Sequence, residues 1–128
     1  MTRFGCPRQY PAGARRRRSQ PDDLRCGQFT IRPERSHQWL SLIDDFTQAT
    51  RHAAGNIFCE WSRNVDDPHQ FIVVEGFESK EADEAHLNSD YFRAAMAWIP
   101  DLIVKAPEIV KAEVPQDGWH EVTELSPR

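Results

Sequence analysis

The residues best suited to chemistry are one histidine, His86, and a small group of aromatic and amide side chains. With an unperturbed pKa of about 6.5, a histidine can accept a proton near neutral pH. Trp61 can stack on an aromatic ring, and Asn56 can hydrogen-bond a carbonyl oxygen. Phe58 and Phe92 can add apolar walls around a substrate. This set would suit removal of a proton from a phenol, quinol or anthrone in a dry pocket, after which the electron-rich anion reacts with oxygen.

Each polar candidate also has a plain structural interpretation. His86 can be a core histidine bonded to a carboxylate such as Glu75 or Glu60. A tryptophan in a half-buried strand, such as Trp61, commonly serves packing, and Asn56 can occupy a turn conformation that asparagine tolerates. The residue types alone leave both interpretations open.

A predicted hairpin and the helix after it position these residues. The two strands are Ile57–Arg63 and Phe71–Phe77, separated by an Asp-Asp-Pro break. Ser79 offers a hydroxyl that can cap the following helix, whose first turn holds Glu81, and His86 follows one turn later. This helical region is expected to kink near Asn88–Asp90 and to end at Pro100. Its predicted inward residues are Ala82, Ala85, Ser89, Phe92, Met96 and Ile99.

The remaining pattern completes a βαββαβ order. A first strand around Phe29–Ile31 ends at Pro33, a helix runs from Ser36 to about Ala53, and a last strand spans Ile109–Val114. The predicted buried stripe of the first helix is Leu40, Ile43, Phe46, Thr50 and Ala53. This order predicts a ferredoxin-like α+β fold. Because the hairpin strands are apolar on both faces, one face should lie under the helices and the other needs a further partner.

The charge divides the 128 residues into two unlike parts. Residues 1–24 hold six of the 16 Lys and Arg and two of the 20 Asp and Glu, so their formal charge is +4 and that of residues 25–128 is -8. The first part lacks apolar periodicity, so we predict a disordered, dispensable extension before one folded domain at 25–128. We interpret the run Arg15–Arg18 as a solvated tail or an unnatural upstream start, rather than as a nucleic-acid or membrane site.

The remaining features argue against metal and membrane chemistry. Cys6, Cys26 and Cys59 are odd in number and contain no CxxC pair, so neither a disulfide framework nor a zinc site is indicated. The other histidines have no metal-ligand spacing. No stretch has the length of a secretory signal core or a membrane span, so we expect a cytoplasmic protein.

Five segments follow one another along the chain: IRPE, GNIFCEWSRNVDDP, FIVVEGFESKEADEAHLNSDYFRAAM, EIVKAEVP and GWHEVTEL. In this order, from Phe29 to Leu125, they resemble the antibiotic biosynthesis monooxygenase family, in particular its small quinol monooxygenase-like bacterial members. The resemblance implies a homodimeric α+β barrel in which two ferredoxin-like sheets face each other. Because the hairpin is apolar on both faces, we also expect the terminal segment Trp119–Leu125 to reach the partner. The resemblance also implies oxygenation of a small aromatic or quinol substrate by O2 without metal, flavin or haem as cofactor.

Two features qualify this resemblance. Family members open with a strongly apolar strand, whereas this chain has the polar run from Asp22 to Gly27, which predicts a shortened or frayed edge strand. Haem-degrading relatives carry a tryptophan where this chain has His86 and an iron-ligating histidine near Met96, which counts against haem.

A non-catalytic dimer that binds aromatic or quinone ligands is the alternative to an enzyme, because fold does not establish activity. The sequence specifies neither the substrate nor its pathway.

Overall fold

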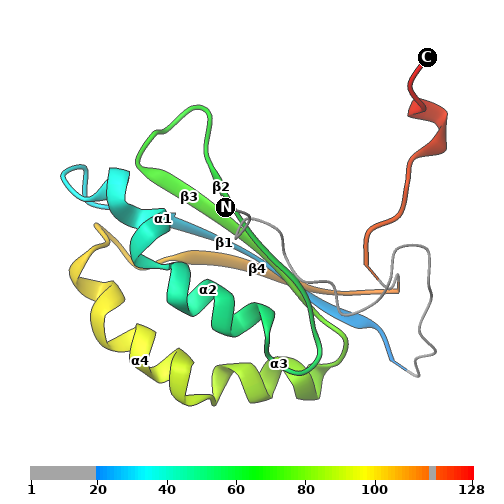
Figure 1. Cartoon of the computed structure of the whole chain (residues 1–128), viewed down its shortest axis with the longest axis horizontal. Coiled ribbons are helices and arrows are strands. Elements are labelled where there is room, and N and C mark those ends of the chain that lie inside the picture. The colour runs from blue at the N-terminus through cyan, green and yellow to red at the C-terminus, as the bar shows by residue number, and fades with distance from the viewer. Residues whose placement is uncertain (1–19, 116–117) are drawn as a thin grey trace.

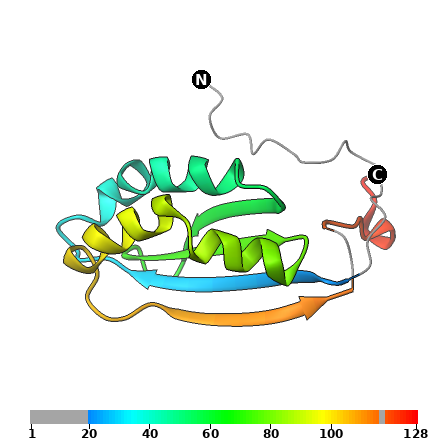
Figure 2. The same cartoon turned by 90° about the horizontal axis from the view of Figure 1, so that it is seen from below.

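Four antiparallel strands form one sheet in the order β2-β3-β1-β4, and the helices cover one of its faces (Figures 1 and 2). The computed structural model describes residues 20–115 and 118–128. The strands are β1 (Asp22–Thr30), β2 (Asn56–Arg63), β3 (Gln70–Phe77) and β4 (Glu108–Val114). The α-helices are α1 (Trp39–Leu42), α2 (Asp44–Arg51), α3 (Lys80–Leu87) and α4 (Asp90–Trp98), and short 3-10 turns span Ser36–Gln38, Ile99–Asp101 and Thr123–Leu125. This topology confirms the predicted ferredoxin-like α+β fold.

The first strand is longer and more central than predicted. It begins at Asp22 and lies between β3 and β4, so Asp23 pairs with Phe77 on one side and with Glu113 on the other. The predicted boundary at residue 24 and the predicted frayed edge strand are therefore wrong. Backbone pairing on both sides holds these polar residues extended even though their side chains give no strand pattern. The predicted disorder of residues 1–19, including the arginine run, lies outside the described residues.

A truncation tests this boundary. Deleting residues 1–24 removes Asp23 and Leu24, which pair with both β3 and β4, and Asp22, which pairs with β4. We expect the melting temperature (Tm) to fall by at least ~5 °C. Deleting only residues 1–19 is the control, for which the sequence predicts a nearly unchanged Tm. Differential scanning calorimetry of both proteins makes the comparison. Equal Tm values for the two deletions would show that residues 22–24 contribute nothing to the sheet.

The predicted first helix is broken into two short helices that meet at Ile43. Ser36 does not cap it; its hydroxyl donates to the Pro33 carbonyl at 3.3 Å and contacts His69 Nδ1 at 2.9 Å. Trp39 is fully buried, whereas Leu40 is 46% exposed. The predicted buried position of Leu40 is therefore wrong.

The second helical region follows the prediction more closely. The Ser79 hydroxyl caps α3 by accepting from the Ala82 N–H at 3.0 Å, and the Ser89 hydroxyl caps α4 by accepting from the Phe92 N–H at 3.2 Å. These two caps confirm the helix start and the kink near Asn88–Asp90. The fully buried residues of α3 are Asp83 and His86, and the predicted inward residue Ala85 is exposed. A charged partner on the sheet, described below, explains why α3 turns this polar face inward.

The two faces of the sheet differ. Helices cover one face, where the core consists of Ile31, Trp39, Ile43, Phe71, Ala95, Ile99 and Leu102. The other face carries no helix in Figure 2, although strand alternation places Cys26, Val74, Val110 and Phe58 on it. This confirms that the strands are apolar on both faces. No helix among the described residues is long and apolar enough to cross a bilayer.

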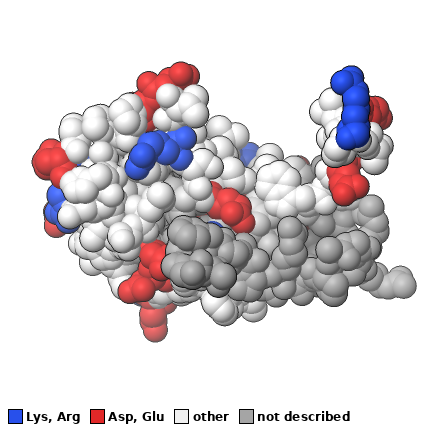
Figure 3. Space-filling view, turned by 45° about the horizontal axis from the view of Figure 1, so that its top comes forward, with Lys and Arg blue, Asp and Glu red and all other residues white. Residues whose placement is uncertain are grey.

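The C-terminal segment contacts this uncovered face and then leaves it. Trp119 lies against Phe58 with ring centroids 5.2 Å apart. Beyond it the chain rises away from the sheet in Figure 1, and the space-filling view in Figure 3 shows the same projection. Val122 and Leu125 are 62% and 80% exposed. The tail therefore presents apolar side chains to the surroundings.

Candidate active site

A cavity of about 320 Å³ lies between the covered face of the sheet and helices α2 to α4. Its sheet side is formed by Arg25, Gly27, Phe29, Trp61, Val73, Glu75 and Ile109. Its other walls are formed by Ile43, Phe46, Leu87, Phe92, Met96, Ile99, Pro100, Ile103 and Pro107. Met96 and Ile109 are 42% and 54% exposed, which places the mouth of the cavity beside them. The lining is thus almost entirely apolar.

The two ionisable residues among this lining lie together at one end. Arg25 and Glu75 are register partners across β1 and β3, and the next inward pair along the same strands is Gly27 and Val73. Both charged side chains are buried, with 7% and 6% exposure. The strands therefore give the cavity one polar end and an apolar remainder, which is the form of a site that orients a small ligand.

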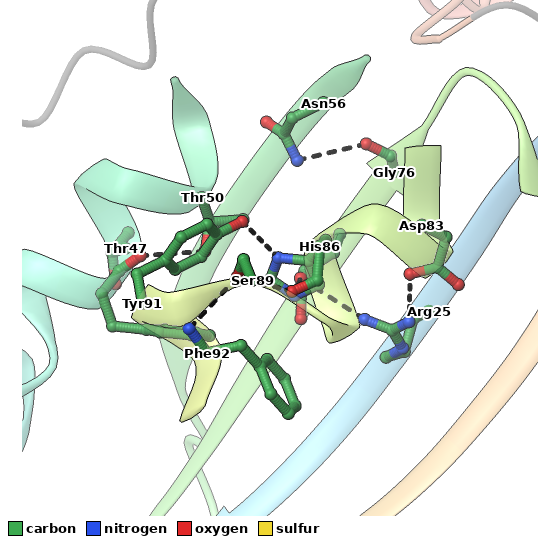
Figure 4. A network of polar contacts seen from close by, with 12 residues as sticks. Arg25, Thr47, Thr50, Asn56, Gly76, Asp83, His86, Ser89, Tyr91 and Phe92 are labelled. Atoms are coloured by element: carbon green, nitrogen blue, oxygen red, sulfur yellow. Dashed lines mark hydrogen bonds and ion pairs between the residues drawn. The ribbon is translucent and has the colours of Figure 1, made fainter. Parts of the chain in front are cut away.

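Arg25 is the centre of a buried ion-pair network (Figure 4). Its Nη2 donates to Asp83 Oδ1, and its Nη1 lies 3.6 Å from Glu75 Oε1. Asp83 also has Lys111 Nζ at 3.5 Å from its second oxygen. Asp83 on α3 thus holds the guanidinium group in place, which explains the inward polar face of that helix.

Burial raises the pKa of Glu75 to about 7, with the Asp83 carboxylate adding to the rise and the Arg25 charge opposing it. Near neutral pH both protonation states of this carboxyl group are therefore populated. A carboxyl group with this pKa at the polar end of an apolar cavity is suited to accept and release a proton.

His86 lies behind Glu75 rather than in the cavity lining. It is 2% exposed, and its Nδ1 is 2.5 Å from the Tyr91 hydroxyl oxygen. Its Nε2 is 3.5 Å from Glu75 Oε1. Burial, with the Arg25 charge, lowers the pKa of His86 to about 4, so the ring is neutral at pH 7. The structural interpretation, a core histidine beside Glu75, matches this geometry, and a direct catalytic role for His86 stays a prediction.

Two buried polar atoms face each other in this network without a hydrogen bond. Glu75 Oε1 and His86 Nε2 have no hydrogen-bond partner within the described part of the chain, although 3.5 Å separates them. An unsatisfied buried polar group costs roughly 1–3 kcal/mol. Such atoms in a native structure call for a functional explanation.

Trp61 and Phe92 both line the cavity, where the sequence-based hypothesis needed them. Trp61 Nε1 donates to Thr47 Oγ1 at 3.0 Å. Its ring also meets Trp39 edge to face, with centroids 5.6 Å apart. The tryptophan is therefore held rigidly in the wall, and its role in substrate binding stays a prediction.

Phe58 and Asn56 lie outside this cavity, so they do not belong to the site with Trp61. Because alternate side chains point to opposite faces, Phe58 lies on the uncovered face, where it lines a separate hollow of about 290 Å³ with Trp119. Asn56 is 1% exposed, and its amide donates to the Phe58 and Gly76 carbonyls at 3.1 and 3.3 Å. These bonds lie at the irregularity in β2 between Asn56 and Phe58 and give Asn56 a structural role in the strand. The predicted turn conformation of Asn56 is wrong, because the positive φ of 82° at this turn belongs to Gly55.

Arg25 and Asp83 are not among the residues predicted from the sequence, where Glu75 is a candidate only as a partner of His86. One signal was available for Glu75, because a carboxylate interrupts the otherwise apolar run FIVVEGF at an inward position. The pairing of Glu75 with Arg25 depends on the register of strands distant in sequence, which local patterns do not specify.

Comparison with known proteins agrees with this fold. The model of the family described as "Antibiotic biosynthesis monooxygenase" matches residues 26–98. The chain belongs to the antibiotic biosynthesis monooxygenase family. One curated relative is an uncharacterized protein, sll1783, from Synechocystis sp. (strain ATCC 27184 / PCC 6803 / Kazusa), which is 23% identical over 83 residues. That match covers 65% of this chain and 56% of the relative, so the chain spans little more than half of the relative's length.

Several solved structures share the monooxygenase-family fold at low sequence identity. A conserved protein from Methanosarcina mazei Go1 has a TM-score of 0.70 and 16% identity, over 74% of this chain and 94% of that one. A candidate antibiotic biosynthesis monooxygenase from Nitrosomonas europaea has a TM-score of 0.69 and 11% identity, over 76% of this chain and 93% of that one. Another candidate from Caulobacter crescentus CB15 has a TM-score of 0.69 and 19% identity, over 76% of this chain and 92% of that one. At these identities the likeness shows the fold alone.

Proposed function

We propose that this antibiotic biosynthesis monooxygenase family member oxidises a quinol or an anthrone-like polycyclic aromatic with O2, without metal, flavin or haem. The observation that carries the proposal is the apolar cavity that ends on Arg25 and Glu75. A volume of about 320 Å³ is at the small end of the roughly 300–1,000 Å³ typical of ligand pockets. It favours a flat ligand of two or three rings over a macrocycle such as haem.

The cavity supplies what this chemistry needs from a protein. The aromatic substrate lies between Trp61 and Phe92, with its phenolic oxygen at the Arg25 and Glu75 end. Loss of the phenolic proton makes the substrate a reductant for O2, and the buried Arg25 charge favours the anion that forms. A quinol and O2 then give a hydroxylated quinone and water. The quinol supplies all four electrons, one oxygen atom enters the ring and the other leaves in water.

Filling the cavity tests this function. A Cβ atom on Gly27 would lie 3.3 Å from Ile109 Cγ2 and 3.4 Å from Val73 Cγ1, so a side chain there occupies the cavity floor. We expect Gly27→Val to lower kcat/KM for quinols by about tenfold or more, about 1.4 kcal/mol, mainly through KM. Ala94→Val, an exposed change on α4 outside the cavity lining, is the control with wild-type turnover. Equal kinetics for both variants would place the reaction elsewhere.

The same assay separates an enzyme from a binding protein. The panel contains quinols and anthrones, used in air with protein shown free of metal and flavin. If the wild-type protein binds quinones tightly but turns over none of these compounds, a non-catalytic binder of aromatic ligands replaces the enzyme.

We propose further that a second copy of this chain covers the uncovered sheet face as a symmetric homodimer. The face is apolar, and Val110 on it is 71% exposed, which is unfavourable for an isolated sheet. The apolar tail from Trp119 to Leu125 extends beyond the sheet, where a partner could bind it.

A charge on this face is expected to weaken the dimer. Val110→Glu should shift the protein toward monomer in sedimentation velocity at micromolar concentration, because dimerisation would bury the carboxylate. Val65→Glu is the matched control, since Val65 is 96% exposed in the loop between β2 and β3. A wild-type protein that sediments as a folded monomer would exclude the homodimer.

A further inference from the structure

We propose that Glu75 accepts the substrate proton, and that His86 is a positioning residue acting through Glu75. This inference rests on the proposed function, because it names the residue that starts that reaction. It departs from the choice suggested by residue type alone, which favours the histidine.

Access separates the two candidates. Glu75 contributes to the cavity lining, whereas His86 is enclosed by aromatic side chains. The ring centroids of Phe77, Phe92 and Phe46 lie 4.9, 5.3 and 5.9 Å from the His86 ring. A general base must come within hydrogen-bond reach of the proton it removes, directly or through one water. A substrate in the cavity meets Glu75 before it could reach His86.

The contacts of the two His86 ring nitrogens leave no acceptor atom for the substrate. Burial raises the pKa of Tyr91, so its phenol keeps its proton and can donate to His86 Nδ1 at 2.5 Å. The proton of the neutral ring then lies on Nε2, which faces Glu75 Oε1. An ionised Glu75 requires this tautomer, because a bare ring nitrogen would set two acceptors against each other. His86 therefore directs an N–H group at the carboxylate and stabilises its charged form.

Glu75 is packed among titratable groups on every neighbouring element. These are Arg25 on β1, Cys59 on β2, Asp83 and His86 on α3, Tyr91 on α4, and Lys111 on β4, which acts through Asp83. Proton transfer from a phenol to Glu75 moves one negative charge from the carboxylate to the substrate oxygen. Arg25 lines the same end of the cavity, so its positive charge faces the anion before and after the transfer. The net charge of the buried site does not change, so the low-dielectric cavity does not have to stabilise an additional charge during the transfer.

Turnover of the quinol panel by three variants tests the two roles. Glu75→Gln should lower kcat by about 10²–10⁴ while quinone binding is retained. His86→Leu removes the N–H group and should shift the rising limb of the pH–rate profile to higher pH. His86→Gln can donate but cannot act as a base near neutral pH, so it should restore the wild-type profile to within about tenfold in rate. If both His86 variants lose activity equally while Glu75→Gln does not, His86 is the base and the proposal is overturned.

A binding experiment judges Glu75 even if the wild-type protein turns over no quinol, an outcome that refutes the proposed function alone. The probe is 4-nitrophenol, whose phenolate is coloured. At pH 7, we expect a larger phenolate fraction of the probe with the protein than at the same probe concentration in buffer, together with an infrared band of a protonated carboxyl group. Glu75→Gln should show neither change. If 4-nitrophenol produces no carboxyl change in the wild-type protein, Glu75 is not the proton acceptor.

Discussion

Replacing Arg25 with alanine is expected to lower the free energy of unfolding by about 3–5 kcal/mol, the usual cost of removing one partner of a buried ion pair. The guanidinium group faces Asp83 and Glu75, which are 3% and 6% exposed. Without it, both carboxyl groups must stay buried beside one remaining cation, Lys111, at 3.5 Å from Asp83. Urea unfolding monitored by tryptophan fluorescence measures the change.

Arg93→Ala is the matched control. Arg93 pairs with Asp90 on α4, and their side chains are 63% and 96% exposed. Exposed pairs of this kind contribute about 0–1 kcal/mol. A loss below about 1 kcal/mol for Arg25→Ala, equal to that of the control, would contradict the view that Arg25 organises the polar end of the cavity.

The stability of the Glu75 and His86 variants should depend on pH in opposite directions. The pKa of Glu75 is raised from 4.5 to about 7, so its neutral form contributes stability that is full below pH 4.5 and is lost as the pH rises through about 7. The pKa of His86 is lowered from 6.5 to about 4, so its neutral form contributes stability above pH 6.5 that is lost as the pH falls through about 4. Between about pH 4.5 and 6.5 the two contributions offset each other in the wild-type protein.

Each single variant should show the pH dependence of the group that it keeps. The reference is the double variant Glu75→Gln/His86→Gln, because subtracting its free energy of unfolding cancels the titration of all other groups. Relative to it, His86→Gln should lose stability as the pH rises from 5 to 6.5, and Glu75→Gln should gain stability. One pKa unit corresponds to about 1.4 kcal/mol, so differences of about 1–2 kcal/mol are expected over this window. Urea unfolding at pH 5.0, 5.75 and 6.5 provides the values. Parallel curves for the two single variants would mean that neither pKa is shifted by burial.

The hairpin and the second helical region could be predicted because their signals are local. Ser79 and Ser89 each precede a helix they cap, and the Asp-Asp-Pro break separates two apolar strands. The start of β1 could not be predicted, because Asp22 and Asp23 are held extended by neighbours that come more than 50 residues later in the chain. Non-local pairing overrides the weak local preference of such residues.

The candidate site likewise contains some residues that local sequence patterns predict and others that depend on contacts between distant segments. Trp61 and Phe92 could be chosen from strand and helix periodicity, since each needs only to face inward. The meeting of Arg25, Asp83 and Glu75 requires the register of β1 with β3 and the docking of α3, which no single segment encodes. His86 could be chosen from its residue type. Its burial behind Glu75, which favours a positioning role, could not be predicted from the sequence.

The central claim is that a phenolic substrate bound in this cavity is oxygenated by O2 without a cofactor. Its most direct test is the reaction of quinols with ¹⁸O2, using wild-type protein shown free of metal and flavin, followed by mass spectrometry of the product. The account predicts one labelled oxygen atom in a hydroxylated quinone, and an initial rate that Glu75→Gln lowers by about 10²–10⁴. An unlabelled quinone formed with hydrogen peroxide, or a rate no higher than that of the quinol in buffer, would contradict it.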